Sequence, residues 1–230
     1  MLLCMKKLIC YSLWGTDKLY NFGMLENVIL SETIYPDWIV RIYYGSCDPL
    51  ILSKLKTFRY VELIEMDLEN LLSNSMWRFL PAFNEDCIML FRDADSRISM
   101  DEKNAVDEWL KSDKDFHIMR DNIAHRPKIM GGLWGCRNGI LIPLKNTFQE
   151  YFKRVRGSKL DRYGVDQIFL RDVVYPYIYS NSFVHASPVQ RKYEPHAKDF
   201  PTRISKNFMG EKINIYDEVE KLLNEKDCIE

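Results

Sequence analysis

The sequence Asp86-Cys-Ile-Met-Leu-Phe-Arg-Asp93-Ala-Asp95-Ser-Arg97 is an apolar run that ends in two carboxylates one residue apart. Cys87 to Phe91 is too short for a typical helix, and its composition favours a strand inside a sheet that is covered on both faces. In open α/β sheets ligands bind where strands end, so carboxylates directly after a central strand are placed like a site. Because alternate side chains of an extended segment point the same way, Asp93 and Asp95 can share one divalent cation that holds a diphosphate.

An Asp-x-Asp triplet is by itself a weak signal. A chain with 33 acidic residues is expected to contain such triplets by chance, and most of them are solvated loop carboxylates. The apolar strand directly in front of this pair is what favours a metal site over a solvated loop.

Length and composition indicate one globular domain. The 230 residues suit a single α/β domain over 1–230, and 47% hydrophobic with 28% charged residues argues against a disordered, collagenous or coiled-coil chain. A net charge of −1 argues against nucleic acid or an anionic membrane as a partner recognised by bulk electrostatics. We therefore expect no basic patch of the kind that such partners need.

The six cysteines indicate reduced thiols. They stand at 4, 10, 47, 87, 136 and 228 without a Cys-x-x-Cys pair, so neither a zinc site nor a disulfide framework is expected. The N-terminus lacks a secretory pattern, and no apolar run approaches the ~20 residues that span a bilayer. The expected location is the cytoplasm, without a transmembrane segment.

Strand and helix patterns alternate up to the acidic pair. The expected strands are 7–14, 38–44, 61–66 and 87–91, and the expected helices begin at Thr16 or Asp17, at Pro49 and at Ser75. This alternation predicts right-handed βαβ crossovers and a mostly parallel sheet flanked by helices.

The second half of the chain is less regular. Further helices are expected at 100–110, 148–155, from Gly164 onward and at 215–223, and further strands at 116–119 and 138–142. Gly131, Gly132 and Gly135 cannot form the interior of a regular element. They predict a bent segment that brings backbone close to a ligand.

Five segments stand in a distinctive order. They are Ile9-Cys-Tyr-Ser-Leu-Trp-Gly15, Met76-Trp-Arg-Phe79, Phe91-Arg-Asp-Ala-Asp-Ser-Arg97, Met119-Arg-Asp121 through Gly131-Gly-Leu-Trp-Gly135, and Gly164-Val-Asp-Gln167. With the tail from Phe200-Pro-Thr-Arg203 to Asn207-Phe-Met-Gly210, this order resembles nucleotide-sugar glycosyltransferases of the GT-A fold. The likeness is to the small glycosyltransferase domains of chloroviruses and other large DNA viruses, and to related bacterial polysaccharide-synthesis proteins. It covers roughly residues 7 to 210.

The resemblance implies transfer of a hexosyl or deoxyhexosyl group from a UDP-sugar to a glycan or protein-linked glycan, in the host cytoplasm if the chain is viral. It implies that Asp93, Ala94 and Asp95 lie at the donor, with both carboxylates holding Mn²⁺ or Mg²⁺. Asp95 is expected to bind the metal most directly, and Asp93 to divide its role between metal and ribose. A divalent ion offsets the charge that develops on the leaving diphosphate. His185 is the expected third ligand, with an ordinary loop histidine as the alternative.

The resemblance also places Tyr11, Ser12 and Leu13 against the uridine, although Tyr11 is equally typical of a core residue. Arg78 is expected to reach phosphate or to hold Asp93 in place, because a guanidinium can fork between oxygens. An ordinary surface salt bridge is the competing interpretation of Arg78.

Two further carboxylates remain for the chemistry. In an inverting transferase one Asp takes the proton from the acceptor hydroxyl as it attacks C1. We expect inverting chemistry with Asp166 as the base, although Asp166 is also typical of a helix N-cap. Asp121 is the other candidate for the base, or it binds sugar hydroxyls, and the sequence does not separate the two.

His125, Gly132 and Trp134 are the residues expected at the sugar or the acceptor. Buried packing is the alternative for Trp134. His117 lies in an expected strand and is expected in the core.

Two other functions stay open at the level of sequence. A phosphohydrolase of the haloacid-dehalogenase type also carries Asp-x-Asp after an apolar strand, but that strand comes first in the chain and Thr or Val follows the pair. Here three strand–helix units come first and Ser96-Arg97 follows. A transferase-like domain that only binds a nucleotide or a glycan is the alternative without catalysis.

Overall fold

The computed structural model describes residues 5–67, 73–155, 164–201 and 204–213, and the expected helix at 215–223 lies outside them. The first half contains β1 (Lys7–Trp14), α1 (Lys18–Ile34), β2 (Ile39–Gly45), α2 (Pro49–Leu55), β3 (Val61–Glu65), the 3₁₀ helix η1 (Asn74–Phe83) and β4 (Ile88–Phe91). All of its strand pairings are parallel. The alternation predicted from the sequence is thus confirmed.

Local sequence explains where these elements begin and end. α1 begins after Asp17, whose side chain accepts a hydrogen bond from the Leu19 N–H at 2.9 Å, as an N-cap does. α2 begins in the same way after Asp48, with Pro49 at its first position. β1 ends at Gly15, where φ is +71° and a side chain would be strained.

The register of β1 and β4 positions the acidic pair. Cys10 lies opposite Phe91, so β4 ends while β1 continues toward Trp14. The chain after Phe91 therefore leaves the sheet at the level of Ser12. This places the two carboxylates at the carboxyl edge of the sheet, beside the end of β1.

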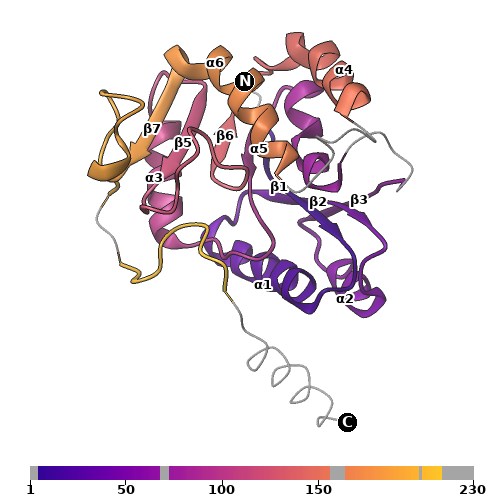
Figure 1. The fold of residues 1–230 in the computed structure, drawn as a ribbon. Coiled ribbons are helices and arrows are strands. Elements are labelled where there is room, and N and C mark those ends of the chain that lie inside the picture. The colour runs from indigo at the N-terminus through magenta and orange to yellow at the C-terminus, as the bar shows by residue number, and fades with distance from the viewer. Residues whose placement is uncertain (1–4, 68–72, 156–163, 202–203, 214–230) are drawn as a thin grey trace.

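The second half extends the same sheet. It contains α3 (Met100–Leu110), β5 (Phe116–Arg120), β6 (Trp134–Cys136), η2 (Ile142–Leu144), α4 (Lys145–Val155), α5 (Val165–Phe169), the π-helical turn η3 (Leu170–Val174), α6 (Tyr175–Ile178), η4 (Tyr179–Asn181), β7 (Ser182–Ala186) and η5 (Pro188–Gln190). The strand order in the described residues is β3-β2-β1-β4-β6-β5-β7, with β6 antiparallel to both neighbours. Figure 1 shows α1 and α2 on one side of this sheet and α4 to α6 on the other.

The expected strand at 138–142 is wrong, because a turn occupies that position. Asn138 and Gly139 have φ of +66° and +59°, which breaks an extended segment. The strand lies earlier, at 134–136, so Gly135 is inside a regular element after all. A Cβ at Gly135 would lie 2.7 Å from the Met89 carbonyl oxygen, so only glycine lets β6 approach β4 this closely.

The core surrounds the sheet on both sides. One apolar cluster lies under α4 and α5, where Phe83 stacks on Phe148 with ring centroids 4.3 Å apart. The other lies between the sheet and α1, and includes Trp109. No helix in the described segments has the length and apolar character that crossing a membrane requires.

Candidate active site

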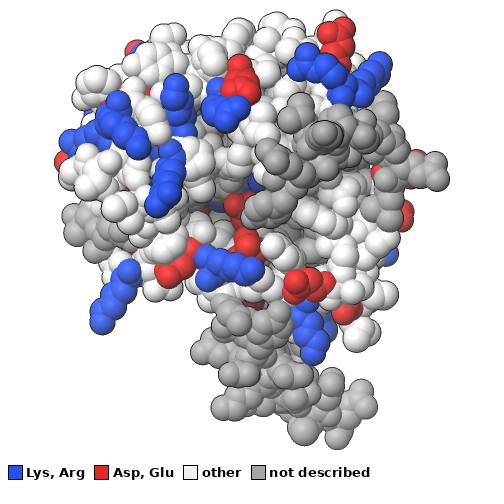
Figure 2. All heavy atoms as spheres, viewed as in Figure 1, with Lys and Arg blue, Asp and Glu red and all other residues white. Residues whose placement is uncertain are grey.

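A cavity of about 660 Å³ opens at the carboxyl ends of β1 and β4. Five groups of residues line it: Ser12 and Trp14 at the end of β1 with Tyr20 of α1; Ser73, Ser75 and Arg78 at η1; Asp93, Ala94 and Asp95; Ala124, Pro127 and Met130; and Gly164, Asp166 and Gln167 at α5. Figure 2 shows the cavity as a hollow at the centre of the face, with Asp or Glu residues inside it. The sequence expectation that the acidic pair, Arg78 and Asp166 share one site agrees with this lining.

Asp93 is fixed on both sides of its carboxylate. Its Oδ1 forms an ion pair with Arg78, and its Oδ2 lies against Gly132. A Cβ at Gly132 would overlap this carboxylate. Gly132 was expected to bring backbone close to a sugar, whereas in the structure it makes room for the Asp93 side chain.

Asp95 carries a charge that the protein only partly offsets. Burial raises the pKa of the Asp95 carboxyl, the neighbouring Asp93 raises it further, and Lys212 and Arg78 oppose the shift. A group at this position gains from a bound cation, because a cation relieves the repulsion between two nearby carboxylates.

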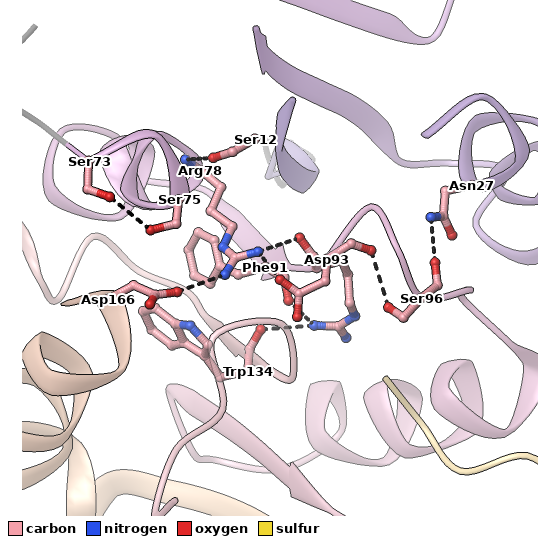
Figure 3. A network of polar contacts seen from close by, with 11 residues as sticks. Ser12, Asn27, Ser73, Ser75, Arg78, Phe91, Asp93, Ser96, Trp134 and Asp166 are labelled. Atoms are coloured by element: carbon pink, nitrogen blue, oxygen red, sulfur yellow. Dashed lines mark hydrogen bonds and ion pairs between the residues drawn. The ribbon is translucent and has the colours of Figure 1, made fainter. Parts of the chain in front are cut away.

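Asn27 of α1, together with Ser96 of the turn itself, holds the turn that carries the pair. The Asn27 side chain donates to the Ser96 carbonyl at 2.7 Å and accepts from the Ile98 N–H at 3.0 Å. The Ser96 hydroxyl donates to the Asp93 carbonyl at 3.2 Å, as Figure 3 shows. The turn is therefore fixed by side-chain hydrogen bonds from a neighbouring helix.

Arg78 joins three parts of the site. Its guanidinium donates to the Arg92 carbonyl at 3.0 Å, pairs with Asp93, and reaches Asp166 Oδ2 at 3.3 Å. Figure 3 shows it between these two carboxylates. With Arg78 only 5% exposed, a surface salt bridge is excluded. Of the two remaining roles expected for Arg78, binding phosphate and holding Asp93 in place, the contacts support the second.

Asp166 lies in the first turn of α5, behind Gly164, whose φ is +88°. Burial raises the pKa of the Asp166 carboxyl, and the Arg78 guanidinium opposes the shift. A buried carboxylate with a raised pKa and one cationic partner is an arrangement typical of a general base.

Gln167 is a site residue for which the sequence indicated no role. With its amide oriented to satisfy both neighbours, it donates to the Ile129 carbonyl at 3.0 Å and accepts from the Gly131 N–H at 2.6 Å. A Cβ at Gly131 would lie 2.7 Å from a nitrogen of Arg78. Gln167 and Gly131 thus bring the loop before β6 against Asp166 and Arg78.

Lys212 is the second missed residue. The Ile213 N–H donates to the Asp95 carbonyl at 2.9 Å, and the Lys212 ammonium lies 5.9 Å from the centre of the Tyr20 ring, at the cavity. The segment 204–213 thereby brings a cation to the acidic pair. No sequence motif marked Lys212, because only the folded chain brings it near Asp95.

Asp121 and His125 lie together outside the cavity lining. Asp121 Oδ2 accepts from the Met209 N–H at 2.9 Å, and its Oδ1 lies 3.3 Å from His125 Nδ1. Burial, with help from Arg120, lowers the pKa of His125 to about 4. His125 packs edge-on against Phe208, with ring centroids 5.4 Å apart, and it is not among the residues that line the cavity.

His185 does not lie at the acidic pair. It is fully buried in β7, with its ring nitrogens 2.9 Å from His117 Nε2 and 3.1 Å from Glu108 Oε2. Because both nitrogens already have partners, the expected third metal ligand is corrected to a core histidine. His117 lies in the core, as expected.

Trp134 and two residues of β1 are core residues too. Trp134 is fully buried, with its ring 4.3 Å from that of Phe91, so it offers no surface to a sugar. Tyr11 and Leu13 are at most 1% exposed, because β1 is a central strand covered on both faces. Of the three residues expected at the uridine, only Ser12 lines the cavity.

The acidic pair suits a cation that is shared with a substrate. Among the described residues, no three His, Cys, Asp or Glu side chains gather into a complete metal site. Mg²⁺ is typically held by one or two carboxylates together with substrate phosphates and water. Asp93 and Asp95 match that donor set, whereas a dedicated protein cage would need more ligands.

Comparisons with known proteins support the fold. No protein-family model and no curated sequence matches the chain. Solved structures do: a glycosyltransferase involved in glycosylation of the major capsid of PBCV-1 (14% identity, TM-score 0.47, 79% of this chain and 81% of that one), GlyE of Streptococcus pneumoniae TIGR4 (9%, 0.50, 78% and 45%), and the mannosyltransferase PcManGT of Pyrobaculum calidifontis in complex with GDP-Man and Mn²⁺ (15%, 0.44, 71% and 50%).

The chain spans less than half of GlyE and half of PcManGT. At these identities the likeness concerns the fold alone. The predicted fold class, an α/β domain of the GT-A type with a mostly parallel sheet flanked by helices, is confirmed.

Proposed function

We propose that this chain is a metal-dependent glycosyltransferase that moves a sugar from a UDP-sugar to a glycan acceptor. The observation that carries the proposal is the acidic pair at the end of β4, in one cavity with Arg78 and Asp166. The GT-A fold supports the reaction class by analogy.

The donor half of the cavity supplies binding and orientation. Ser12, Trp14 and Tyr20 surround the position for the nucleoside, and the half-exposed Trp14 ring offers a stacking surface for the base. Asp93 and Asp95 would hold Mn²⁺ or Mg²⁺, which when bound neutralises charge on the departing diphosphate. Lys212 adds a second positive charge to this side of the cavity.

The proposed chemistry is a single displacement at C1. The acceptor hydroxyl attacks C1 as the bond from C1 to the diphosphate oxygen breaks, its proton passes to a carboxylate oxygen of Asp166, and UDP leaves. Attack from the face opposite to the leaving group inverts the configuration at C1. Two features support Asp166 over Asp121 as the base: it lines the cavity, whereas Asp121 accepts a backbone N–H elsewhere.

The test is nucleotide release from a panel of UDP- and GDP-sugars with Mn²⁺, by the wild type and by Asp95→Ala. The exposed Asp37 offers a matched control in Asp37→Ala. We expect Asp95→Ala to abolish release while the control keeps it, and unchanged turnover in Asp95→Ala would remove the central claim.

Calorimetry with UDP and Mn²⁺ separates catalysis from mere binding. Tight binding without turnover of any donor would support a transferase-like binding domain instead. A preference for GDP-sugars would keep the reaction class and change the donor.

A further inference from the structure

Five exposed side chains gather on two neighbouring segments, and we call them the basic patch: Arg126, Lys128, Lys192, Ile123 and Val189. The three cations are exposed, and the two aliphatic side chains are 73% and 63% exposed. The net charge of −1 predicts no basic patch, but these three cations form a local one.

Hydrogen bonds join the two segments into one surface. The Gln190 side chain donates to the carbonyls of Asn122 at 3.0 Å and Ile123 at 3.1 Å. The Tyr193 hydroxyl donates to the Arg126 carbonyl at 3.0 Å. Below them, the fully buried Arg120 donates to the Lys128 carbonyl. The positions of the patch residues thus depend on a buried framework and not on a free loop.

The positive charge of the basic patch is not neutralised by neighbouring acids. The ammonium groups of Lys128 and Lys192 lie 5.7 and 4.9 Å from the centre of the same Tyr193 ring. No carboxylate in the described residues forms an ion pair with any of the three cations. The nearby Glu194 is buried against Arg120. Positive charge is therefore concentrated at the basic patch, although the net charge of the whole chain is only −1.

The basic patch adjoins the mouth of the cavity. Ala124, Pro127 and Met130 line the cavity, and they alternate along the same loop with the patch residues Arg126 and Lys128. In Figure 2, Lys and Arg side chains gather on the side of this face where β5 and β7 lie in Figure 1, next to the central hollow. A partner bound to the patch therefore lies beside the mouth of the cavity.

We propose that the basic patch binds the surface of an anionic lipid bilayer. Cations next to exposed aliphatic side chains suit such a surface, because the cations meet anionic headgroups while the aliphatic tips enter the interfacial region. A soluble polyanion would use the three cations but would leave Ile123 and Val189 in water. The two exposed aliphatic side chains are what favour the bilayer.

The consequence for catalysis rests on the proposed function. A bilayer bound at the basic patch places the cavity mouth beside the membrane surface, so the acceptor class would be a glycan carried on a membrane lipid. Binding to the bilayer is independent of turnover, so it can fail or succeed separately from donor hydrolysis in solution.

The experiment is cosedimentation of the full chain with vesicles of pure phosphatidylcholine and with vesicles of equal parts phosphatidylcholine and phosphatidylglycerol. We expect binding to the anionic vesicles that weakens with added salt. Each basic residue contributes about fivefold to partitioning, so Arg126→Gln/Lys128→Gln/Lys192→Gln should lose roughly 100-fold. Ile123→Ser/Val189→Ser should lose about tenfold on vesicles and nothing on soluble polyphosphate.

The chain offers a control with the same change in charge. Lys54→Gln/Lys56→Gln/Arg59→Gln alters two exposed lysines and one exposed arginine at and after α2, beside the opposite end of the sheet. The control should bind anionic vesicles like the wild type.

Two results would overturn the proposal. One is an equal loss of vesicle binding in both triple variants. The other is binding to polyphosphate without binding to anionic vesicles, which would identify a soluble polyanion as the partner. Donor hydrolysis by the patch variant should match the wild type.

Discussion

Two groups of acidic side chains in this molecule have opposite surroundings. Asp93, Asp95 and Asp166 face the cavity, and burial raises the pKa of Asp95 and Asp166 because their charge is only partly offset. Asp101, Asp121 and Glu194 instead have their oxygens occupied by the protein. Asp166 and Asp121 are buried alike, 7% and 8% exposed, so for these two the partners of the carboxylate, and not its burial, separate a candidate catalytic acid from a structural one.

The structural acids fold the irregular second half. Asp101 accepts the N–H groups of Ile204 and Ser205, both at 2.8 Å, and Asp121 accepts that of Met209 at 2.9 Å. Glu194 pairs with Arg120 and accepts from the Tyr175 hydroxyl at 2.5 Å. In the loops outside β5, β6 and β7, carboxylates thus accept backbone N–H groups that no strand or helix pairing satisfies.

The largest expected effect is that of Asp95→Asn. Under the proposed function, turnover should fall by at least about 10³-fold, since a bound metal would supply several kcal/mol of leaving-group stabilisation. Stability should not fall, because the ionised Asp95 is disfavoured in the folded chain, so a neutral side chain removes repulsion. Nucleotide release and thermal unfolding measured together check both statements, and a large loss of stability would place Asp95 among the structural acids.

A matched pair tests the base. Asp166→Asn should lower kcat at least about 10²-fold with little change in the melting temperature, since a general base contributes 10²- to 10⁴-fold. Asp121→Asn should do the reverse, lowering stability by about 1–3 kcal/mol through the weakened Met209 contact and leaving kcat within a few-fold. If kcat falls more in Asp121→Asn, the assignment of the base is reversed.

Glu194→Gln addresses the buried ion pair. Losing the carboxylate leaves Arg120 buried without its counter-charge, so we expect a destabilisation of about 3–5 kcal/mol and a melting temperature lower by roughly 10 °C. The folded fraction should still hydrolyse the donor. Unfolding by urea measures the first effect, and a kcat loss without a stability loss would contradict the structural role.

The smallest expected effect is a pH dependence of stability. His125 has a folded pKa of about 4, so at pH below about 6.5 the unfolded chain binds protons that the folded chain does not. The melting temperature should therefore be steady above that pH and fall as the pH drops toward 4. His125→Gln should flatten part of this slope, and the same change at the exposed His196 should not. An unchanged slope in His125→Gln would show that His125 does not titrate as the structure indicates.

The first half of the fold was predictable because its signals are local. Strands such as Lys7–Trp14 follow from apolar periodicity, and helix starts follow from capping residues such as Asp17. The strand expected at 138–142 failed because Asn138 and Gly139 form a turn, which apolar content alone does not reveal. Gly132 was expected to bring backbone close to a ligand, and in the structure the group next to it is the Asp93 carboxylate.

Candidate site residues were predictable where they follow an element that the sequence predicts. Asp93 and Asp95 follow β4, and Asp166 begins α5, so their position in the cavity follows from topology. His185 and Trp134 failed because their surroundings come from strands far away in the chain. The type of a residue in a loop or strand does not by itself specify which way its side chain faces.

The sequence by itself determined the parallel first half and the acidic pair at the end of its central strand. Only the tertiary structure decided that Arg78 bridges Asp93 and Asp166, that Lys212 reaches the pair, and that Asp121 folds the tail. The physical reason is range. Strand and helix signals act within a few residues, whereas the neutralisation of a charge depends on which distant side chains the packed core brings within hydrogen-bond distance.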